Sequence, residues 1–160
     1  MAYPADALFT FEGVDDNPGF LLNQVTAHWH RQLAQVLAPH GLTPTQFLLM
    51  TSVHRLSQRP EPVTQALVAQ HARTDKMTTS KTVRALEEEG LLARPTHEQD
   101  ARARSLSLTP AGLKAVVRAA WLVEEFDQQF FGPDVARLMQ TLQTLRPPQP
   151  ELPKQAADPT

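Results

Sequence analysis

Residues 74–91 read TDKMTTSKTVRALEEEGL, and their spacing decides how the rest of the chain is interpreted. At about 100° per residue, the small and apolar positions of this stretch fall on one side of a helix. They are Thr79, Val83, Leu86 and Gly90. A helix is therefore expected from Asp75 or Lys76 to Glu89, with Gly90 just past its end, where glycine suits the C′ position.

The opposite side of this helix is polar and basic in its N-terminal half. Small hydroxyl side chains allow close approach to DNA, and Lys or Arg can reach guanine acceptors or phosphates. The side chains predicted to contact DNA from this helix are Lys76, Met77, Thr78, Ser80, Lys81 and Arg84. Met77 is the large apolar exception, which either contacts a thymine methyl group or is tucked under the preceding turn. The acidic run at 87–89 would repel phosphate, so only the N-terminal half is expected to enter a groove.

Net charge alone does not identify a partner for this chain. The whole sequence carries 15 Lys+Arg against 17 Asp+Glu, a formal net charge of -2. Segment 73–84, however, contains four basic residues and one acidic residue. A local field of this kind can attract an anionic polymer, although an ordinary solvated helix face is the simpler interpretation of charge alone.

The neighbouring segments place this helix in a winged helix. Thr64 is expected to cap a short helix that ends at a turn over 72–74, which gives a helix-turn-helix. Residues 91–96 are predicted as a short edge strand, 97–103 as a loop, and 104–109 as a second strand in which Ser and Leu alternate. A helix-turn-helix followed directly by a hairpin is the order of elements in a winged helix.

Amphipathic helices are expected on both sides of this unit. One is predicted over about 20–37, and residues 17–19 are expected to close the irregular segment before it. Thr43 and Gln46 are expected to form a capping box at the start of the next helix. A long helix and a last short helix are predicted within 110–146. The apolar positions of the long helix are Leu113, Val117, Ala120, Trp121, Leu122, Phe126 and Phe130.

Taken together, these residues resemble the MarR-type (multiple-antibiotic-resistance regulator) winged-helix transcription factors. The resemblance extends from roughly Phe20 to Leu145. The motifs that carry it are Ser80, Arg84-Ala-Leu-Glu87-Glu-Glu-Gly90-Leu-Leu-Ala-Arg94, Asp100-Ala-Arg102 and Leu106-Ser-Leu108-Thr109-Pro-Ala-Gly112. The chain departs from the family pattern after the wing aspartate, where Ala101 stands in place of a basic residue and Arg104 is additional. Which arginine occupies the wing tip is therefore open.

The resemblance implies a mainly α protein with a small β-hairpin wing. A protomer over 19–146 would contain a winged helix-turn-helix over about 43–109 between dimerisation helices over about 20–38 and 110–146. Residues 1–18 are expected to form a flexible arm, and residues 147–160 a disordered tail.

The implied assembly is a homodimer on double-stranded DNA. Two recognition helices would enter successive major grooves of a pseudo-palindromic site, with half-site centres ~10 bp apart. The side chains expected at the dimer interface are Leu22, Trp121, Phe126, Leu138, Leu142 and Leu145.

The resemblance also implies roles for the wing residues Asp100, Arg102 and Arg104. Arg102 matches the family position that enters the minor groove, and a narrow A·T-rich minor groove attracts arginine through its negative potential. Asp100 matches the acid that braces the wing, through Arg94, Arg102 or Arg104. The simpler interpretation of Asp100 is an aspartate that caps a turn.

Many members of this family bind small aromatic or phenolic anions between the dimerisation helices and the winged helix. The candidates for lining such a pocket here are Trp29, Phe47, Met50 and His54. Ordinary core packing is the simpler interpretation for each of them. No cofactor is predicted, and the effector would be an unidentified small aromatic or phenolic molecule.

Several other kinds of chemistry find no support in the sequence. Cysteine is absent, which excludes disulfides and thiolate zinc sites. His28 and His30 point ~200° apart on a helix, so they cannot chelate one metal ion. No motif for a catalytic nucleophile, phosphate loop or helical zinc site is present, and an enzyme is not expected. No apolar run approaches the ~18 residues of a membrane span, so no span is expected. The absence of cysteine suits a reducing cytosol, and a cytoplasmic location is the expectation.

Two classes of function remain. The leading hypothesis is a sequence-specific DNA-binding regulator, acting as a repressor that a small ligand relieves. The alternative is a winged-helix module that binds another protein without specific DNA binding. The basic outward stripe of the helix over 76–89 favours DNA.

Overall fold

The computed structural model describes residues 17–94, 96–97 and 100–147, with side chains described for 17–94 and 105–147. The elements, in chain order, are α1 (Pro18–Leu37), the 3-10 helix η2 (Ala38–His40), α2 (Pro44–Leu56), α3 (Gln65–Ala72), α4 (Lys76–Glu88), β1 (Leu92–Ala93), β2 (Thr96–His97), β3 (Asp100–Arg104), β4 (Ser107–Leu108), α5 (Pro110–Phe131) and α6 (Val135–Leu145). The expected fold class is confirmed: the chain is mainly helical, with a small hairpin after the helix-turn-helix. The arm predicted before residue 17 and the tail predicted after residue 147 lie outside the described residues.

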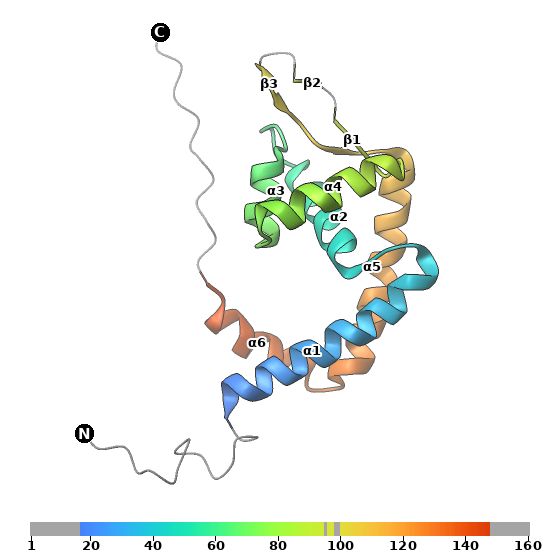
Figure 1. The fold of residues 1–160 in the computed structure, drawn as a ribbon. Helices are drawn as coiled ribbons and strands as arrows, with labels where there is room; N and C mark the ends of the chain where they lie inside the picture. The colour runs from blue at the N-terminus through green and yellow to red at the C-terminus, as the bar shows by residue number, and fades with distance from the viewer. Residues whose placement is uncertain (1–16, 95, 98–99, 148–160) are drawn as a thin grey trace, which may run out of the picture.

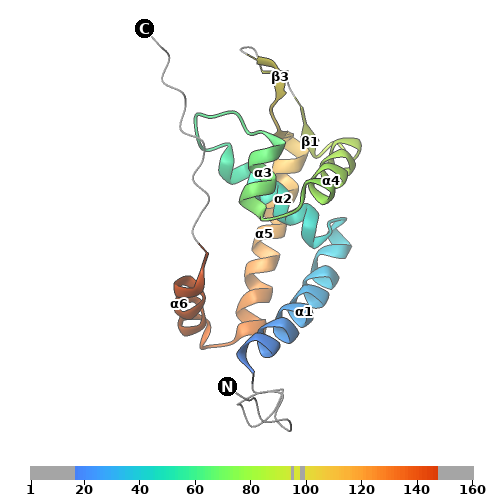
Figure 2. The ribbon, with the colours of Figure 1, turned by 60° about the vertical axis from the view of Figure 1, so that its left-hand side comes forward.

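The elements gather at two ends of the molecule. In Figure 1, α2, α3 and α4 lie together with the hairpin projecting from them, and α5 runs from this unit toward α1 and α6 at the other end. Figure 2 shows α6 standing apart from the long axis of α5. The winged helix therefore lies at one end of the molecule, and α6 and the start of α1 lie at the other. Helix α5 and the C-terminal half of α1 connect the two ends.

Helix α1 begins earlier than the apolar pattern indicated. The side chain of Asn17 accepts hydrogen bonds from the backbone amides of Gly19 at 3.0 Å and Phe20 at 3.1 Å. Asn17 is therefore the N-cap, and Pro18 takes the first helical position, where a missing N–H costs nothing. The expectation that 17–19 only closes the preceding segment was wrong, because these residues start the helix.

The caps of α2 and α3 are confirmed. In α2, Gln46 N donates to Thr43 Oγ1 at 3.2 Å, and Thr43 N donates to Gln46 Oε1 at 2.9 Å, which is a complete capping box. In α3, the Thr64 hydroxyl oxygen accepts from Leu67 N at 3.2 Å. Both helices therefore start where the short polar side chains predicted.

The turn between α3 and α4 contains a residue in a left-handed conformation. Arg73 has φ 53° and closes α3 by donating its backbone N–H back to the helix. Asp75 then caps α4, which ends at Glu88, one residue earlier than expected, with Glu89 as its C-cap. Gly90 follows with φ 69°, the conformation that favours glycine at a C′ position.

The hairpin extends further than the side-chain pattern indicated. Strands β2 and β3 pair antiparallel, with Thr96 opposite Arg104 and His97 opposite Asp100. The prediction of a loop over 97–103 was therefore wrong for His97 and for the part that lies in β3. Backbone pairing carries the hairpin beyond the residues that pack on the core, and alternation of apolar side chains detects only the packed part.

The second predicted strand, over 104–109, changes partners along its length. Ser105 forms an isolated antiparallel bridge with Thr64, and Leu106 N donates to Val63 O at 2.6 Å. Strand β4 then pairs with β1. Leu106 is 2% exposed, so the base of the wing is anchored in the core.

One hydrophobic core joins α1 to α5, and none of its members comes from α6. The fully buried large side chains include Leu37 of α1, Leu49, Met50 and Val53 of α2, Val68 of α3, and Val83 and Leu86 of α4. These helices therefore fold onto one another within a single chain.

Helix α5 carries two apolar faces. Val116, Ala119 and Phe126 pack into the core, whereas Leu113, Val117 and Trp121 are exposed. The stripe read from the sequence thus mixes an outward face with an inward one. Spacing alone cannot say which of two apolar faces meets the core of the same chain.

The motif at the start of α5 requires a glycine at position 112, because the backbone of Leu91 lies too close for a side chain. A Cβ atom built at this position would lie 1.9 Å from the backbone oxygen of Leu91. Thr109 closes the same corner, because its hydroxyl donates to Gly90 O at 2.7 Å and accepts from Gly112 N at 3.0 Å. The end of α4 and the start of α5 are therefore locked together at the base of the wing.

Candidate nucleic-acid interface

Helix α4 presents a basic and polar face to solvent. Of the six side chains predicted to contact DNA from α4, five are exposed and Ser80 is half-buried. Met77, Ser80, Lys81 and Arg84 line one open groove of about 470 Å³, together with Ala85 and Glu88. The structure thus brings four of the six together, while Lys76 and Thr78 lie exposed near the helix start.

Met77 points outward. Its side chain is 83% exposed, so the alternative in which it is tucked under the preceding turn is wrong. An apolar side chain this exposed gains nothing from burial within its own chain. The groove of α4 therefore offers one apolar contact among its polar and charged groups.

The opposite face of α4 is rigidly seated. Thr79, Val83 and Leu86 are each 0% exposed. The Thr79 hydroxyl lies 2.8 Å from Asp75 O and 2.8 Å from the hydroxyl oxygen of Thr74, so the polar atom is satisfied inside the core. The predicted inner face is confirmed for these three residues, whereas Gly90, past the end of the helix, is exposed. The buried face fixes which side chains turn outward.

The start of α4 is held by Asp75. Its carboxylate accepts from Thr78 N at 2.8 Å. Hydrogen bonds from the Thr78 side chain and then from its backbone amide lower the pKa of the Asp75 carboxyl below its usual value. The carboxylate also complements the positive end of the helix dipole.

The end of α4 is tied to the start of α2 by a contact that sequence reasoning missed. Gln46, 8% exposed, donates its side-chain N–H groups to both carboxylate oxygens of Glu89, each at 3.1 Å. The capping box identified Gln46 as a helix start. Its second role depends on α4 ending beside it, which no local pattern reveals.

Arg94 at the base of the wing makes two contacts. Its Nε lies 2.8 Å from Glu87 Oε1, and its Nη2 donates to Gln65 Oε1 at 3.2 Å. Arg94 is one of the three arginines expected as a possible partner of Asp100. Its observed contacts are with Glu87 of α4 and Gln65 of α3. The backbones of Asp100, Arg102 and Arg104 lie in β3. Their side chains lie outside what the structure describes, so the choice between the two arginines stays open.

The residues expected at a dimer interface divide into two groups. Leu22, Trp121, Leu138, Leu142 and Leu145 are all exposed, with Trp121 at 72% and Leu145 at 71%. Phe126 is 9% exposed and packs in the core of its own chain, against the ring of Phe130. Phe126 is therefore withdrawn from the interface set, because it lies on the inward face of α5.

The four candidates for a ligand pocket do not line one cavity. Met50 is 0% exposed and belongs to the core, so it is withdrawn. Trp29 and Phe47 pack against the core, and the Trp29 indole N–H donates to Asp127 Oδ1 at 2.7 Å. His54 lines a pocket between α2 and α5.

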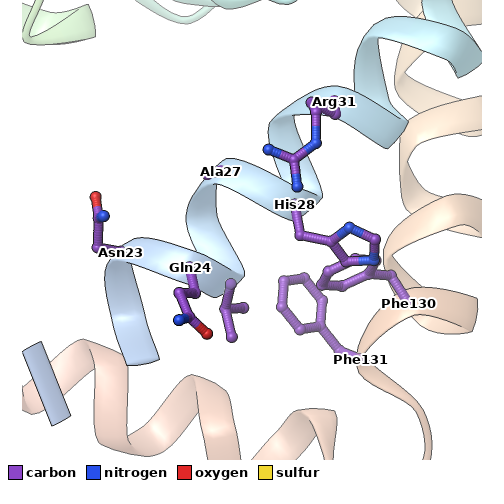
Figure 3. Close-up of a pocket in the computed structure, with 8 residues that line it drawn as sticks. Asn23, Gln24, Ala27, His28, Arg31, Phe130 and Phe131 are labelled. Atoms are coloured by element: carbon purple, nitrogen blue, oxygen red, sulfur yellow. The ribbon is translucent and has the colours of Figure 1, made fainter. Parts of the chain in front are cut away.

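A larger open pocket lies where α1 meets the end of α5. Its volume is about 700 Å³, and Figure 3 shows His28 and Arg31 of α1 near the rings of Phe130 and Phe131. The His28 and Phe130 ring centres are 5.6 Å apart. The exposed side chain of Val25 also lines this pocket, which makes it continuous with the apolar face of α1.

The described residues contain no group of three or more His, Asp or Glu side chains arranged to hold a metal ion. The His28 Nε2 atom lies 3.0 Å from Gln32 Nε2. The ring of His30 instead packs edge-on against the ring of Trp29. Within the described part of the chain, no helix is both long and apolar enough to cross a membrane.

Comparison with known proteins gives the family. The model of the MarR family matches residues 42–103. The uncharacterized HTH-type transcriptional regulator YdcH of Bacillus subtilis (strain 168) is 41% identical over 122 residues, which cover 76% of this chain and 83% of YdcH. The HTH-type transcriptional repressor Rv2887 of Mycobacterium tuberculosis (strain ATCC 25618 / H37Rv) is 34% identical over 113 residues, or 66% of this chain and 78% of Rv2887.

Solved structures share the fold. CouR from Rhodococcus jostii RHA1 bound to p-coumaroyl-CoA superposes with a TM-score of 0.71 at 26% identity, covering 84% of this chain and 95% of CouR. CouR bound to a 23-mer DNA duplex superposes with a TM-score of 0.73 at 24% identity, covering 87% of this chain and 99% of CouR. This chain belongs to the MarR family of winged-helix transcriptional regulators. It is thus a DNA-binding regulator of the helix-turn-helix type, in a family of regulators and not of enzymes.

Proposed function

We propose that this regulator binds a pseudo-palindromic operator as a homodimer and represses transcription until a small ligand binds. In this proposal it acts in the cytoplasm, with the winged helix over about 43–109 on DNA and the helices over about 20–38 and 110–146 forming the dimer. The repressor role follows Rv2887, and CouR provides an example of the same fold on a DNA duplex.

The observation that carries the proposal is the two-faced character of α4. Its inner face is completely buried, so the orientation of the outer face is fixed before DNA arrives. Preorganised groups lose less conformational entropy on docking. The outer face combines Lys81 and Arg84 with the exposed side chain of Met77, a mixture that suits guanine acceptors, phosphates and a thymine methyl group.

The wing supplies the second proposed contact. The hairpin projects from the winged helix on the far side from α6 (Figure 1), and β3 carries Arg102 and Arg104. One of these arginines would enter the minor groove beside the major-groove site of α4. The brace that Asp100 would give to the wing is part of the same proposal.

The homodimer is supported by apolar surface without a partner in its own chain. No residue of α6 is buried, although the helix carries Leu138, Met139, Leu142 and Leu145. Large exposed apolar patches mark interaction sites, because leaving them in water forgoes the hydrophobic gain. The N-terminal half of α1 adds Phe20, Leu21, Leu22 and Val25, each at least 38% exposed.

Salt-titrated binding to fragments of the source genome tests the proposal. We expect specific fragments to bind at submicromolar Kd and to weaken steeply as salt rises, because Lys and Arg displace counterions from phosphates. Binding no stronger than to random DNA at low salt would favour the alternative, a winged helix that binds another protein.

A further inference from the structure

The turn between α3 and α4 keeps an arginine at a position where the backbone favours glycine. Arg73 has φ 53° and ψ 41°, and it is the only non-glycine residue with positive φ in the part of the chain that the structure describes. A side chain costs free energy in this left-handed conformation, because its Cβ atom crowds the following carbonyl oxygen, whereas glycine has no Cβ atom. Strained positions of this kind cluster at functional sites, so the conformation indicates a function for the Arg73 side chain.

The guanidinium of Arg73 is exposed and lies near the end of α6. Its Nη2 atom donates to Pro147 O at 3.4 Å, which is longer than the usual ~2.7–3.2 Å of an N–H···O bond. A guanidinium carries several N–H donors in a fixed fork that matches the oxygens of a phosphate, and this bond uses a single one of them. The weak contact with Pro147 is therefore compatible with a second contact, to an anion.

Positive charge gathers around the same end of α3. Burial and then the charges of three arginines lower the pKa of His71, in the last turn of α3. These arginines are Arg55, Arg59 and Arg146, and within the described residues none of them forms an ion pair with a carboxylate. The carboxylate of Asp75 caps α4. The field around the turn is therefore positive, and such a field attracts phosphate groups.

The turn also lies close to the residues expected in a major groove. Arg73 precedes Lys76, the first residue of α4, by three positions, so their Cα atoms are at most ~11 Å apart. A major groove is ~12 Å wide and is bordered by the phosphates of the two strands. An arginine this close to a helix start that enters the groove can therefore reach the phosphates at its edge.

We propose that Arg73 binds a phosphate of the DNA backbone at the edge of the major groove that α4 enters. The contact adds no base reading to α4, and it fixes the register at which the start of the helix lies on the duplex. Arg73 is thus a positioning residue, which the left-handed turn presents to solvent just before the recognition helix. The inference rests on the proposed function in one respect, which is that α4 lies in a major groove.

Arg73→Gly separates this role from a purely structural one, because its effects on folding and on DNA binding should have opposite signs. Loss of the Cβ atom relieves the backbone, so the melting temperature should stay equal or rise by up to about 4 °C. Affinity for an operator fragment found by selection should fall by about tenfold or more, since each subunit loses a hydrogen bond to a charged group. A lower melting temperature would show that the arginine serves folding, and it would overturn the role.

The salt dependence of binding gives a second readout. The slope of log affinity against log salt should flatten by about 2, because the dimer carries two copies of Arg73 and each releases about one counterion. A phosphate contact carries no sequence information, so the variant should weaken binding to the selected fragment and to random duplex by similar factors. A loss confined to the selected fragment would rule out the phosphate contact. Fluorescence anisotropy on both duplexes measures these quantities.

Two further variants at the same position test whether charge or backbone freedom matters. Arg73→Asn removes the charge but tolerates the left-handed conformation, so it should lose as much affinity as Arg73→Gly. Arg73→Lys keeps a positive charge and should retain most of the salt slope. Arg118→Ala, an exposed arginine on α5, is the control and should have little effect. Wild-type affinity in Arg73→Asn would assign the loss in Arg73→Gly to a loosened turn and would contradict the proposal.

Failure of this proposal and failure of the proposed function give different results. If selection finds no specific fragment, the proposed function fails, and comparing wild type with Arg73→Gly on random duplex at low salt still decides the phosphate contact. Equal affinity of these two proteins for a duplex that wild type binds would overturn the role of Arg73 alone. A wild-type chain that binds no duplex at all would overturn both.

Discussion

The winged helix and the far ends of the flanking helices both carry apolar side chains and use them in opposite ways. In α2 and α4, Met50, Val53, Val83 and Leu86 are each 0% exposed. In α6, no residue is buried. The first region is complete within one chain, whereas the second has a hydrophobic face that its own chain does not cover. The difference separates the residues that specify the fold from those available for assembly.

The largest expected effect comes from placing a charge on the uncovered face. Leu138→Asp should convert a dimer to monomers, because burying an unpaired carboxylate in the seam costs several kcal/mol. Light scattering at micromolar concentration measures this change. Gln140→Asp, on the opposite side of α6, should leave the dimer intact. A dimer that persists in Leu138→Asp would show that the seam lies elsewhere.

Replacing one leucine by alanine in each region tests the contrast between the buried core and the exposed face of α6. Leu86→Ala should lower the free energy of unfolding by about 2–5 kcal/mol, because it leaves a cavity in the core. Leu142→Ala, made in the monomeric Leu138→Asp background, should change it by less than about 0.5 kcal/mol. Denaturant melts measure both, and equal losses would mean that α6 packs on its own chain.

A change on the outward face of α4 should separate DNA binding from assembly. Arg84→Ala should weaken operator binding by about 1–3 kcal/mol and lower the salt slope, without altering the dimer. Arg118→Ala, an exposed arginine on α5, is the matched control and should have little effect. Equal losses in both variants would contradict a specific role for α4.

The wing provides a contact of similar or smaller size. Arg102→Ala should weaken binding by about 1–3 kcal/mol with a reduced salt slope, as measured by fluorescence anisotropy. Arg104→Ala in parallel shows which arginine lies at the tip, since only that one should reduce preference for A·T-rich flanks. Unchanged affinity in both variants would remove the wing from the interface.

The smallest expected effect is a pH dependence within the winged helix. Burial and then the charges of Arg55, Arg59 and Arg146 lower the pKa of His71 below 6.5. The Ser52 hydroxyl donates to Leu48 O, so its oxygen accepts from His71 Nδ1 at 3.0 Å. The unfolded chain therefore binds a proton more readily, and stability is lost as pH falls below 6.5.

Comparing wild type with His71→Gln isolates this contribution. Unfolding free energy measured at pH 7.5 and 5.5 should fall less steeply with acidification in the variant than in wild type. A wild-type slope that the substitution leaves unchanged would assign the pH dependence to other groups.

The parts of the fold that could be predicted are those set by local chemistry. Thr43 with Gln46, Thr64 and Gly90 act within one turn of their own positions, so their roles can be read from neighbouring residues. The two faces of α4 follow from helical spacing, and the structure confirms the buried one.

The predictions fail where contacts that apolar spacing does not encode determine the structure. Phe126 and Trp121 both read as apolar positions of α5, but only Phe126 belongs to the buried core of its own chain. For Met50, the simpler of the two interpretations, ordinary core packing, is the one that the structure supports. The backbone pairing of β2 with β3 carries no apolar signature at all. Long-range packing accounts for the first two differences, and local backbone pairing, which apolar spacing does not encode, accounts for the third.

Hydroxyl-radical footprinting of the intact chain on a selected genomic fragment tests the central claim most directly. Two outward faces of α4, held by one dimer, should protect two patches whose centres lie ~10 bp apart on one side of the duplex. The Leu138→Asp variant should lose this paired pattern. A single patch, or paired protection that survives in the monomer, would contradict an account in which one region reads DNA and the other joins two copies.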